Sequence, residues 1–246
     1  MWLIEVMRLQ KYLAKCGLGS RRTCETFIDQ GRVSVDGKKI TSQGVTIDTQ
    51  KQVVRFDDAI VTPKPIEWIM LYKPPQYLST AKDPSQKTVF LRLLPKEKHH
   101  LFAVGRLDYL SEGLLLVTND GDTANKLIHP RYEIEKEYEV TTVDELSLDQ
   151  LDKMKKGFSI KQDFLSVKSI QCIEENEKKK LWKYSIVITE GKNRHIRKML
   201  SYLNVRLKKL KRIRMGPIQL TNIDMGKWRY LTEKEVDKIH DFVNTH

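Results

Sequence analysis

The amino-acid sequence predicts an α+β protein with a small N-terminal domain and a larger mixed α+β domain. Residues 8–60 alternate between helix-like and strand-like hydrophobic spacing, and a segment with two prolines follows at 61–66. Strand-like and helix-like patterns then alternate toward the C-terminus, which is typical of an α+β domain. A chain of 246 residues is long enough for one large and one small domain.

The first domain is predicted to begin with two short helices. In "RLQKYLAKCGLG", Leu9, Tyr12 and Leu13 share one helical face, and the pattern ends at a glycine. Ser20 is a good N-cap for the helix "RRTCETFIDQ", which is expected to stop at Gly31.

A small sheet is expected after these helices. Asp36-Gly37 stands between the alternating residues of "RVSVDGKKI", and an Asp-Gly pair in that position is a strong hairpin signal. The stretch "VTIDTQKQVVRF" alternates in the same way and predicts further strands.

The segment "VTPKPI" at 61–66 is predicted to be a linker, because its prolines exclude a helix or a central strand. The larger domain, 67–246, is then expected to open with a buried strand from Trp68 to Tyr72 that breaks at Pro74-Pro75. Further along, "EENEKKK" at 174–180 is predicted to be the loop of a hairpin between "LSVKSIQCI" and "LWKYSIVIT".

Composition points to a polyanionic partner. The formal net charge is +12 and the pI is near 9.5, so phosphates are the favoured partner and a membrane surface is the competing one. Because no run of about 18 apolar residues occurs, we expect no membrane span. "MWLIEV" is too short for a signal peptide, so the expected compartment is the cytoplasm, with Met7 as a second candidate start.

We expect neither a metal nor a cofactor. Cys16, Cys24 and Cys172 lack metal-ligand spacing and are predicted to be small buried hydrophobes. The sequence contains no glycine-rich phosphate loop that ends in Lys-Ser or Lys-Thr, and no zinc-deaminase motif.

The segment "VGRLDYLSEGLLLVTNDG" contains the most informative charges. Arg106 and Asp108 stand two residues apart beside Gly105, just before the apolar strand Leu114–Val117. They are either solvated loop charges or a carboxylate held at the mouth of a cleft with a cation beside it. A glycosidase-like pair of Asp108 with Glu112 is a weaker alternative, because residues 111–113 look like a turn.

A second feature is the basic segment, which we define as residues 192–215. It contains ten Lys or Arg residues and no Asp or Glu, and it includes the amphipathic helix "RHIRKMLSYL" and the alternating strand "VRLKKLKRIRMG". Solvated faces usually mix charges of both signs, so this segment is expected to contact RNA. The expected contacts include Lys192, Arg194, Lys198, Lys208, Lys209, Arg212 and Arg214.

Residues 7–60 resemble the S4 RNA-binding domain. The residues that carry this resemblance, in order, are Arg8-Leu9, Leu13, Gly17, Ser20-Arg21-Arg22, Ile28, Gly31 and "VSVDGKKI". Arg21 and Arg22 fall in the first turn of the second helix, where the helix dipole disfavours cations unless a phosphate lies opposite. The RNA contacts expected in this domain are Arg8, Lys11, Arg21 and Arg22, with a solvated basic face as the alternative.

The whole chain resembles pseudouridine synthases of the RsuA type, which include RluB, RluE and RluF. Four blocks occur in the family order: "YKPPQYLST", "VGRLDYLSEGLLLVTNDGDTANKLIHP", "EKEYEV" and "TEGKNRHIRKML". The resemblance implies a mixed-sheet catalytic domain of two similar halves with a cleft between them. Gln76 and Ser111 depart from the glycine and threonine of many relatives. "GKNRHIRKM" is closer to the RluB-like version and favours large-subunit 23S ribosomal RNA.

The resemblance implies a role for each matched residue. Asp108 matches the catalytic aspartate that breaks the uridine N-glycosidic bond, whether by attacking sugar or base or by assisting a glycal route. Arg106 matches the arginine that helps to flip the nucleotide out of the RNA stack. Tyr138 matches the tyrosine that stacks on the uracil, with core packing as the alternative. Arg197 matches the basic residue that pairs with Asp108 and keeps it charged.

Lys136 shares the strand face of Tyr138, so it either contacts RNA at the site or ends the strand in solvent. The leading hypothesis is an enzyme that isomerises one uridine of ribosomal RNA, free or in an assembling ribosomal subunit, and acts as a monomer. The alternatives are 16S ribosomal RNA as substrate and a non-catalytic RNA-binding or ribosome-assembly protein.

Overall fold

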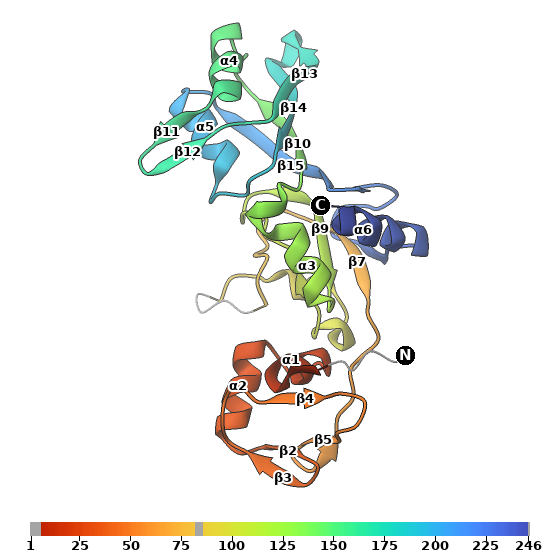
Figure 1. Cartoon of the computed structure of the whole chain (residues 1–246). Coiled ribbons are helices and arrows are strands. Elements are labelled where there is room, and N and C mark those ends of the chain that lie inside the picture. The colour runs from red at the N-terminus through yellow and green to blue at the C-terminus, as the bar shows by residue number, and fades with distance from the viewer. Residues whose placement is uncertain (1–5, 82–85, 246) are drawn as a thin grey trace. The chain divides into compact units, whose positions relative to one another are not determined.

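The computed structural model of the chain, which describes residues 6–81 and 86–245, contains two compact units, Met1–Glu67 and Trp68–His246. Both units contain helices and strands, which confirms the predicted α+β class (Figure 1). The boundary between the units lies after Glu67, one residue beyond the expected linker at residues 61–66.

The described part of the first unit contains two helices and two small sheets, in which β1 pairs with β4 and the other strands follow the order β3-β2-β5-β6. The elements are α1 (Leu9–Lys15), α2 (Arg21–Asp29), β1 (Val6–Arg8), β2 (Val33–Val35), β3 (Lys38–Ile40), β4 (Thr46–Asp48), β5 (Val54–Phe56) and β6 (Ala59–Ile60).

The local signals that predict this unit are present in the structure. The hydroxyl of Ser20 accepts a hydrogen bond from the backbone N–H of Thr23 at 3.1 Å and so caps α2. Asp36 and Gly37 connect β2 and β3 with φ angles of 49° and 78°, the left-handed conformation that a two-residue hairpin turn requires. The predicted helix start and hairpin are therefore confirmed.

Among its described residues, the second unit contains one large sheet, a two-stranded sheet formed by β11 and β12, four α-helices and four short 3-10 helices. Its elements are β7 (Trp68–Lys73), β8 (Phe102–Ala103), β9 (Glu112–Thr118), α3 (Gly121–Ile128), β10 (Lys136–Thr142), α4 (Leu148–Lys156), β11 (Phe158–Ile160), β12 (Asp163–Leu165), β13 (Ser169–Asn176), β14 (Leu181–Ile188), α5 (His195–Tyr202), β15 (Leu207–Met215), β16 (Ile218–Gln219), β17 (Trp228–Tyr230) and α6 (Glu233–Thr245).

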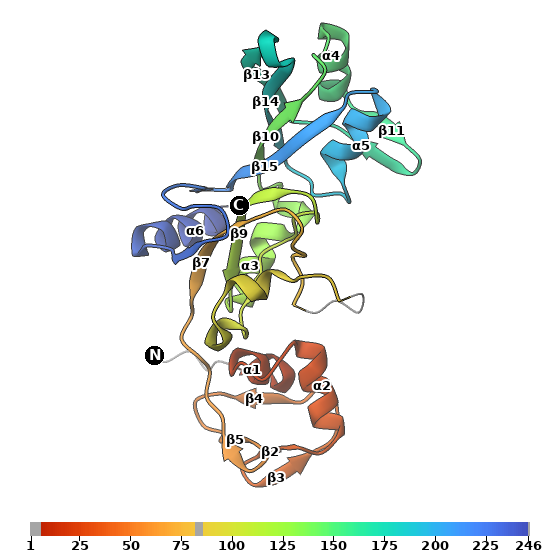
Figure 2. The same ribbon diagram turned by 180° about the vertical axis from the view of Figure 1, so that it is seen from behind.

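The large sheet is mixed and has a narrow junction at its centre. Its strand order is β13-β14-β10-β15-β9-β7-β17, and neighbours are antiparallel except for β15 and β9. That parallel ladder contains two residue pairs, Lys211 with Glu112 and Arg212 with Gly113. It joins two antiparallel parts of the sheet, and Figure 2 shows β15 reaching β9 at this point.

Apolar side chains cover both faces of β9. Leu114 and Leu116 pack with residues of α3 and α6, whereas Leu115 and Val117 belong to the core that includes α4 and α5. Since both faces are buried, the strand is a continuous apolar run rather than an alternating one. The predicted strand over residues 114–117 is thereby confirmed.

Two predicted boundaries are wrong. The strand β9 begins at Glu112, so Glu112 and Gly113 lie in the strand and not in a turn before it, because both pair with β15. The strand β13 continues to Asn176, so the predicted loop at 174–180 is shorter than expected. An ion pair between Glu174 of β13 and Lys183 of β14 connects the two strands in this added part.

In the described ranges, no helix is long and apolar enough to cross a membrane. The same residues contain no group of three or more His, Cys, Asp or Glu placed to hold a metal ion.

Candidate active site

A cavity of about 590 Å³ opens at the junction of β9 and β15. Its wall is formed by the loop before β9, by β10 and β15, and by the segment that leads into α5. The charged and aromatic side chains in the wall include Arg106, Asp108, Tyr109, Lys136, Tyr138, Lys192, Arg194, His195 and Arg212. The cavity therefore brings together residues of all four sequence blocks, which lie far apart along the chain.

Asp108 lines this cavity beside a buried arginine. Nε of Arg197 lies 3.3 Å from Oδ2 of Asp108, although the N–H is not aligned for a hydrogen bond. Nη2 of Arg197 donates to the hydroxyl of Ser111 at 3.0 Å. Burial lowers the pKa of Arg197, and the negative charge of Asp108 opposes this shift. The carboxylate therefore offsets part of the cost of burying the guanidinium.

The amphipathic helix α5 positions Arg197. Ile196, Met199 and Leu200 enter the core, which fixes the rotation of the helix, and Arg197 then faces the loop that carries Asp108. Arg197 does not itself line the cavity, but it contacts two residues of the cavity wall, Asp108 and Ser111.

Two residues that the sequence analysis missed hold the Asp108 loop. Nζ of Lys73 donates to the backbone oxygens of Ser111 at 2.7 Å and Pro74 at 2.8 Å. The hydroxyl of Ser79 accepts from the backbone N–H of Leu107 at 3.0 Å. The signal for Lys73 is its position at the end of the apolar run "WIMLY", directly before two prolines.

Lys73 is fully buried, and this burial lowers the pKa of its ammonium to about 8. The negative charges of Asp108 and Glu112 oppose that shift, whereas Arg212 and Arg197 add to it. Lys73 therefore interacts with charged side chains around the cavity and also forms hydrogen bonds to the loop that carries Asp108.

Lys136 and Tyr138 project from β10 into the same wall. The strand alternates between buried and partly exposed residues, and both side chains are 8% exposed. Nζ of Lys136 donates to the backbone oxygen of Thr189 at 2.8 Å, and burial lowers its pKa to about 8. The alternative prediction for Lys136, a lysine at a solvent-exposed strand end, is therefore wrong.

Arg106 is exposed and lines the cavity together with Asp108. It makes no ion pair within the described residues, and the same holds for the exposed Arg194, which also lines the cavity. Both guanidinium groups are thus available to an anion at the cavity mouth.

Glu112 is not brought together with Asp108 in the cavity wall. Its Oε1 accepts from the hydroxyl of Tyr72 at 2.7 Å and lies 3.1 Å from Nζ of Lys209. The glycosidase-like carboxylate pair is therefore absent from this cavity among the described residues.

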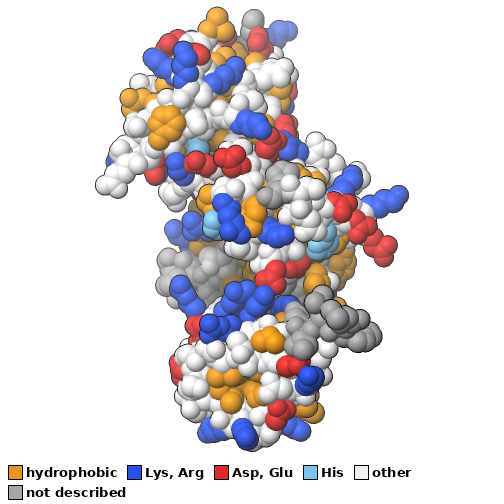
Figure 3. All heavy atoms as spheres, in the orientation of Figure 1, with side chains coloured by type: hydrophobic (Ala, Val, Ile, Leu, Met, Phe, Trp, Pro, Cys, Tyr) orange, Lys and Arg blue, Asp and Glu red, His pale blue; other side chains and the backbone are white. Residues whose placement is uncertain are grey.

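Carboxylates from neighbouring elements neutralise most of the basic segment. On the face of the second unit seen in Figure 3, red acidic side chains lie among blue basic ones. The ion pairs are Lys192–Glu190, Arg197–Asp108, Lys198–Asp163, Arg206–Asp144, Lys209–Glu112, Lys211–Glu139 and Arg214 with both Glu135 and Glu137. RNA contact by the paired cations stays a prediction, and Lys208 has no ion pair within the described ranges.

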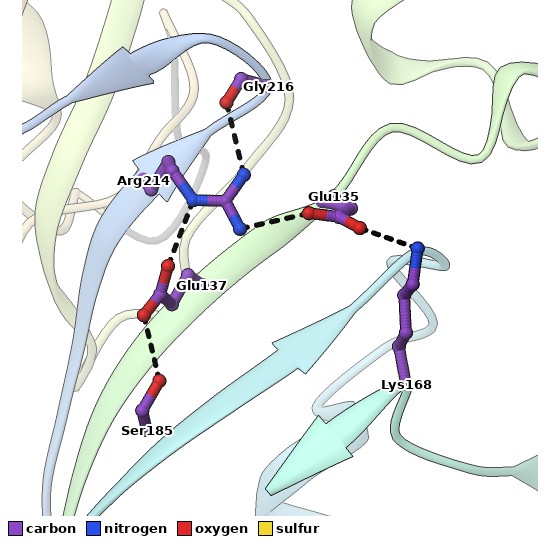
Figure 4. A network of polar contacts seen from close by, with 6 residues as sticks. All are labelled: Glu135, Glu137, Lys168, Ser185, Arg214 and Gly216. Carbon is purple, nitrogen blue, oxygen red and sulfur yellow. Dashed lines mark hydrogen bonds and ion pairs between the residues drawn. The ribbon is translucent and has the colours of Figure 1, made fainter. Parts of the chain in front are cut away.

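Arg214 is held by a polar network rather than presented to solvent (Figure 4). Its guanidinium donates to Glu137 at 2.9 Å, to Glu135 at 3.0 Å and to the backbone oxygen of Gly216 at 3.2 Å. Lys168 and Ser185 extend the network from the other ends of the two carboxylates.

In the first unit, Arg21 and Arg22 lie exposed in the first turn of α2, where no acidic residue accompanies them. Nη1 of Arg8 donates to the backbone oxygen of Gly44 at 2.8 Å. RNA contact by these residues and by Lys11 stays a prediction.

Comparisons with known proteins identify the family of the chain. The family model "RNA pseudouridylate synthase" matches residues 67–202, and the S4 domain model matches residues 7–53. A protein of Aquifex aeolicus named "Uncharacterized RNA pseudouridine synthase" is 34% identical over 95% of this chain and 93% of its own length. The "Ribosomal large subunit pseudouridine synthase B" of Bacillus subtilis is 33% identical, over 94% and 95% of the two chains.

The protein of the same name from Yersinia pestis is 36% identical over 96% of this chain and 76% of its own. Among solved structures, the chain described as "Crystal structure of pseudouridylate synthase" has the same fold, with a TM-score of 0.66 at 23% identity, over 95% of this chain and 99% of that one. The family model covers more than half of the chain and the relatives cover nearly all of it. The chain therefore belongs to the RNA pseudouridine synthases that carry an S4 domain.

Proposed function

We propose that this enzyme converts a specific uridine of large-subunit ribosomal RNA to pseudouridine, with Asp108 as the catalytic carboxylate. The observation that carries the proposal is the position of Asp108 in the cavity wall, 3.3 Å from the guanidinium of Arg197. The names of the Bacillus subtilis and Yersinia pestis relatives support the large subunit as the source of the substrate.

The reaction exchanges one bond for another without a net change in composition. The bond between N1 of uracil and C1′ of the ribose breaks, a bond between C5 and C1′ forms, C5 loses a proton and N1 gains one. An ionised carboxylate can assist by attacking C1′, by attacking the base or by helping to form a glycal. Each route needs a carboxylate that is held in place, and Arg197 provides a cation 3.3 Å from Asp108.

The cavity suits a base that is detached and then rejoined. Its volume lies within the range of roughly 300–1,000 Å³ that is typical of small-molecule sites. The cavity walls limit the escape of the free uracil and the access of water that would compete for C1′. The buried ring of Tyr138 offers a surface on which the base can stack.

The nucleotide must leave the RNA stack to enter this cavity. Flipping a base out of a helix takes a few kcal/mol, which contacts in the pocket must offset. Arg106 is exposed at the mouth and makes no ion pair in the described part of the chain, so it is placed to contact the backbone that remains outside. The S4 domain provides a second RNA-binding region.

The test uses unmodified 23S and 16S ribosomal RNA, each offered free and in isolated subunits. After incubation with the enzyme, pseudouridine is mapped by carbodiimide treatment and primer extension. We expect one new stop in 23S RNA with the wild-type enzyme and none with Asp108→Ala. A stop confined to 16S RNA would refute the large-subunit assignment, and the absence of any stop would refute the proposed activity.

A further inference from the structure

The cavity wall contains two buried polar atoms that have no hydrogen-bond partner in the described chain, Nη2 of Arg212 and Nδ1 of His195. Nε2 of His195 lies 2.9 Å from the backbone oxygen of Ser166, which can only accept, so this nitrogen carries the hydrogen and Nδ1 is the acceptor of the neutral ring. Native structures leave few buried polar groups unsatisfied, and each exception calls for an explanation. A polar ligand in the cavity would explain both.

A β-bulge gives Arg212 its orientation. Along β10 and β15, Glu137 pairs with Arg214 but the next residue, Tyr138, pairs with Arg212, so Ile213 is an extra residue in β15. Paired residues of neighbouring strands point to the same face of a sheet. Arg212 therefore shares the cavity face of Tyr138, whereas Arg214 shares the opposite face with Glu137. Without the bulge, residues 212 and 214 would project to the same face.

Burial and one hydrogen bond fix the guanidinium of Arg212. The residue is 2% exposed, and its Nε donates to the backbone oxygen of Leu114 on β9 at 2.8 Å. No carboxylate forms an ion pair with it in the described residues. By contrast, Nε, Nη1 and Nη2 of Arg214 all have acceptors. Arg212 thus has a fixed donor without a partner, which a ligand could use, whereas Arg214 has none.

We propose that Nη2 of Arg212 donates a hydrogen bond to a ring carbonyl oxygen of the target uracil and stabilises the negative charge on the base when its bond to C1′ breaks. The inference rests on the proposed function and adds a substrate-contacting residue to it. In heterolytic cleavage, the electron pair of the N1–C1′ bond remains on the base, and the ring carbonyl oxygens share the resulting charge. A fixed cation in an enclosed site stabilises such a charge more than it stabilises the neutral base.

Arg212 is better placed for the base than for a phosphate of the RNA backbone. It lies on the face of Tyr138, the proposed stacking surface, and is almost completely buried. The exposed Arg106 and Arg194 at the same cavity are the groups that a phosphate can reach from outside.

The test is a double-mutant cycle between the enzyme and single atoms of the substrate. Short RNA substrates carry uridine, 2-thiouridine or 4-thiouridine at the target position, and single-turnover rates are measured by nucleoside analysis. Sulfur accepts hydrogen bonds more weakly than oxygen, and its other effects on the base are the same for every enzyme variant. The thio effect, defined as the uridine rate divided by the thiouridine rate, therefore isolates the contact.

We expect Arg212→Met to slow the reaction of uridine by about 10²–10³-fold, the range found when one donor to a developing oxyanion is removed. For one of the two thiouridines, the thio effect of the wild-type enzyme should fall toward one in Arg212→Met. Arg212→Lys keeps a buried cation and should react faster than Arg212→Met, again with a reduced thio effect. This variant provides the measurement if Arg212→Met does not fold, which thermal unfolding monitors.

Arg214→Met is the matched control, because it removes a guanidinium two residues away on the opposite face. Its thio effects should equal those of the wild type, whatever its stability. Equal thio effects in wild type and in both Arg212 variants would overturn the inference, as would variants whose single-turnover rate on uridine equals that of the wild type at saturating enzyme. A wild-type enzyme that forms no pseudouridine from uridine would instead overturn the proposed function.

Discussion

At the residue scale, the proposed activity depends on how Asp108 is held. Arg197 places a positive charge 3.3 Å from its carboxylate, while Lys73 and Ser79 bond to the backbone of the same loop. A group that is fixed before the substrate arrives needs less ordering during the reaction. The geometry of one carboxylate therefore rests on three separate segments of the chain.

Lys73 gives a prediction for the pH dependence of stability. Its pKa is about 8 in the folded chain, whereas the ordinary value is 10.5. Between these values the unfolded chain binds more protons, so the contribution of Lys73 to stability is lowest below pH 8 and increases as the pH rises to 10.5. The increase in the free energy of unfolding that Lys73 contributes over this pH range is at most about 3 kcal/mol. Denaturant unfolding of wild type and Lys73→Met at pH 7.5, 9 and 10.5 measures it.

We expect the free energy of unfolding of wild type, relative to Lys73→Met, to increase over this pH range. Lys136 is present in both proteins, so its similar shift cancels in the comparison. A difference that stays constant or shrinks with rising pH would contradict the assignment of a lowered pKa to Lys73.

Sequence motifs identify the residues that line the cavity better than the residues that support them. Arg106, Asp108 and Tyr138 are all predicted from their blocks, and all three lie in one cavity wall. Lys73 is missed because hydropathy places a lysine at the surface. Its buried ammonium donates to the backbone oxygens of Pro74 and Ser111, and Ser111 is 38 residues away in the chain.

At the scale of elements, the contact between β9 and β15 decides where the site forms. A Cβ atom at Gly113 would lie 2.2 Å from the backbone oxygen of Arg212, and the φ of this glycine is +108°. The parallel ladder thus needs a residue without a side chain at this position.

We expect Gly113→Ala to lower the free energy of unfolding by at least ~3 kcal/mol, because β15 must move away from β9. Gly226→Ala is the matched control, since Gly226 has a φ of +81° but open space around its Cβ position. It should lower stability by ~1–2 kcal/mol from backbone strain alone. Equal decreases in the free energy of unfolding of the two variants, measured by denaturant unfolding, would contradict a role for the close approach of β15 to Gly113.

In the basic segment, the sequence pattern predicts the strand but not which side chains of neighbouring strands contact it. The alternation in "VRLKKLKRIRMG" predicts the strand β15, which is confirmed. The segment has no acidic residue, yet Glu137 and Glu139 of the neighbouring strand β10, and Glu135 directly before that strand, reach its cations. The bulge at Ile213, which separates the roles of Arg212 and Arg214, likewise depends on strand pairing and not on composition.

At the scale of the whole molecule, buried apolar clusters belong to one unit or the other. One cluster lies within the S4 unit, and the two clusters of the catalytic unit flank its sheet. The net charge of +12 is distributed over both units, although carboxylates pair with much of it in the catalytic unit. RNA binding and catalysis should therefore be separable by substitution.

Tritium release from ribosomal RNA labelled at carbon 5 of uridine tests this account most directly, because C5 loses its hydrogen when it bonds to C1′. The account predicts that the wild-type enzyme releases tritium from a single site in 23S RNA. Asp108→Asn should bind the same RNA with unchanged affinity and release none. Release by Asp108→Asn at the wild-type rate, or no release by the wild-type enzyme, would contradict the central claim.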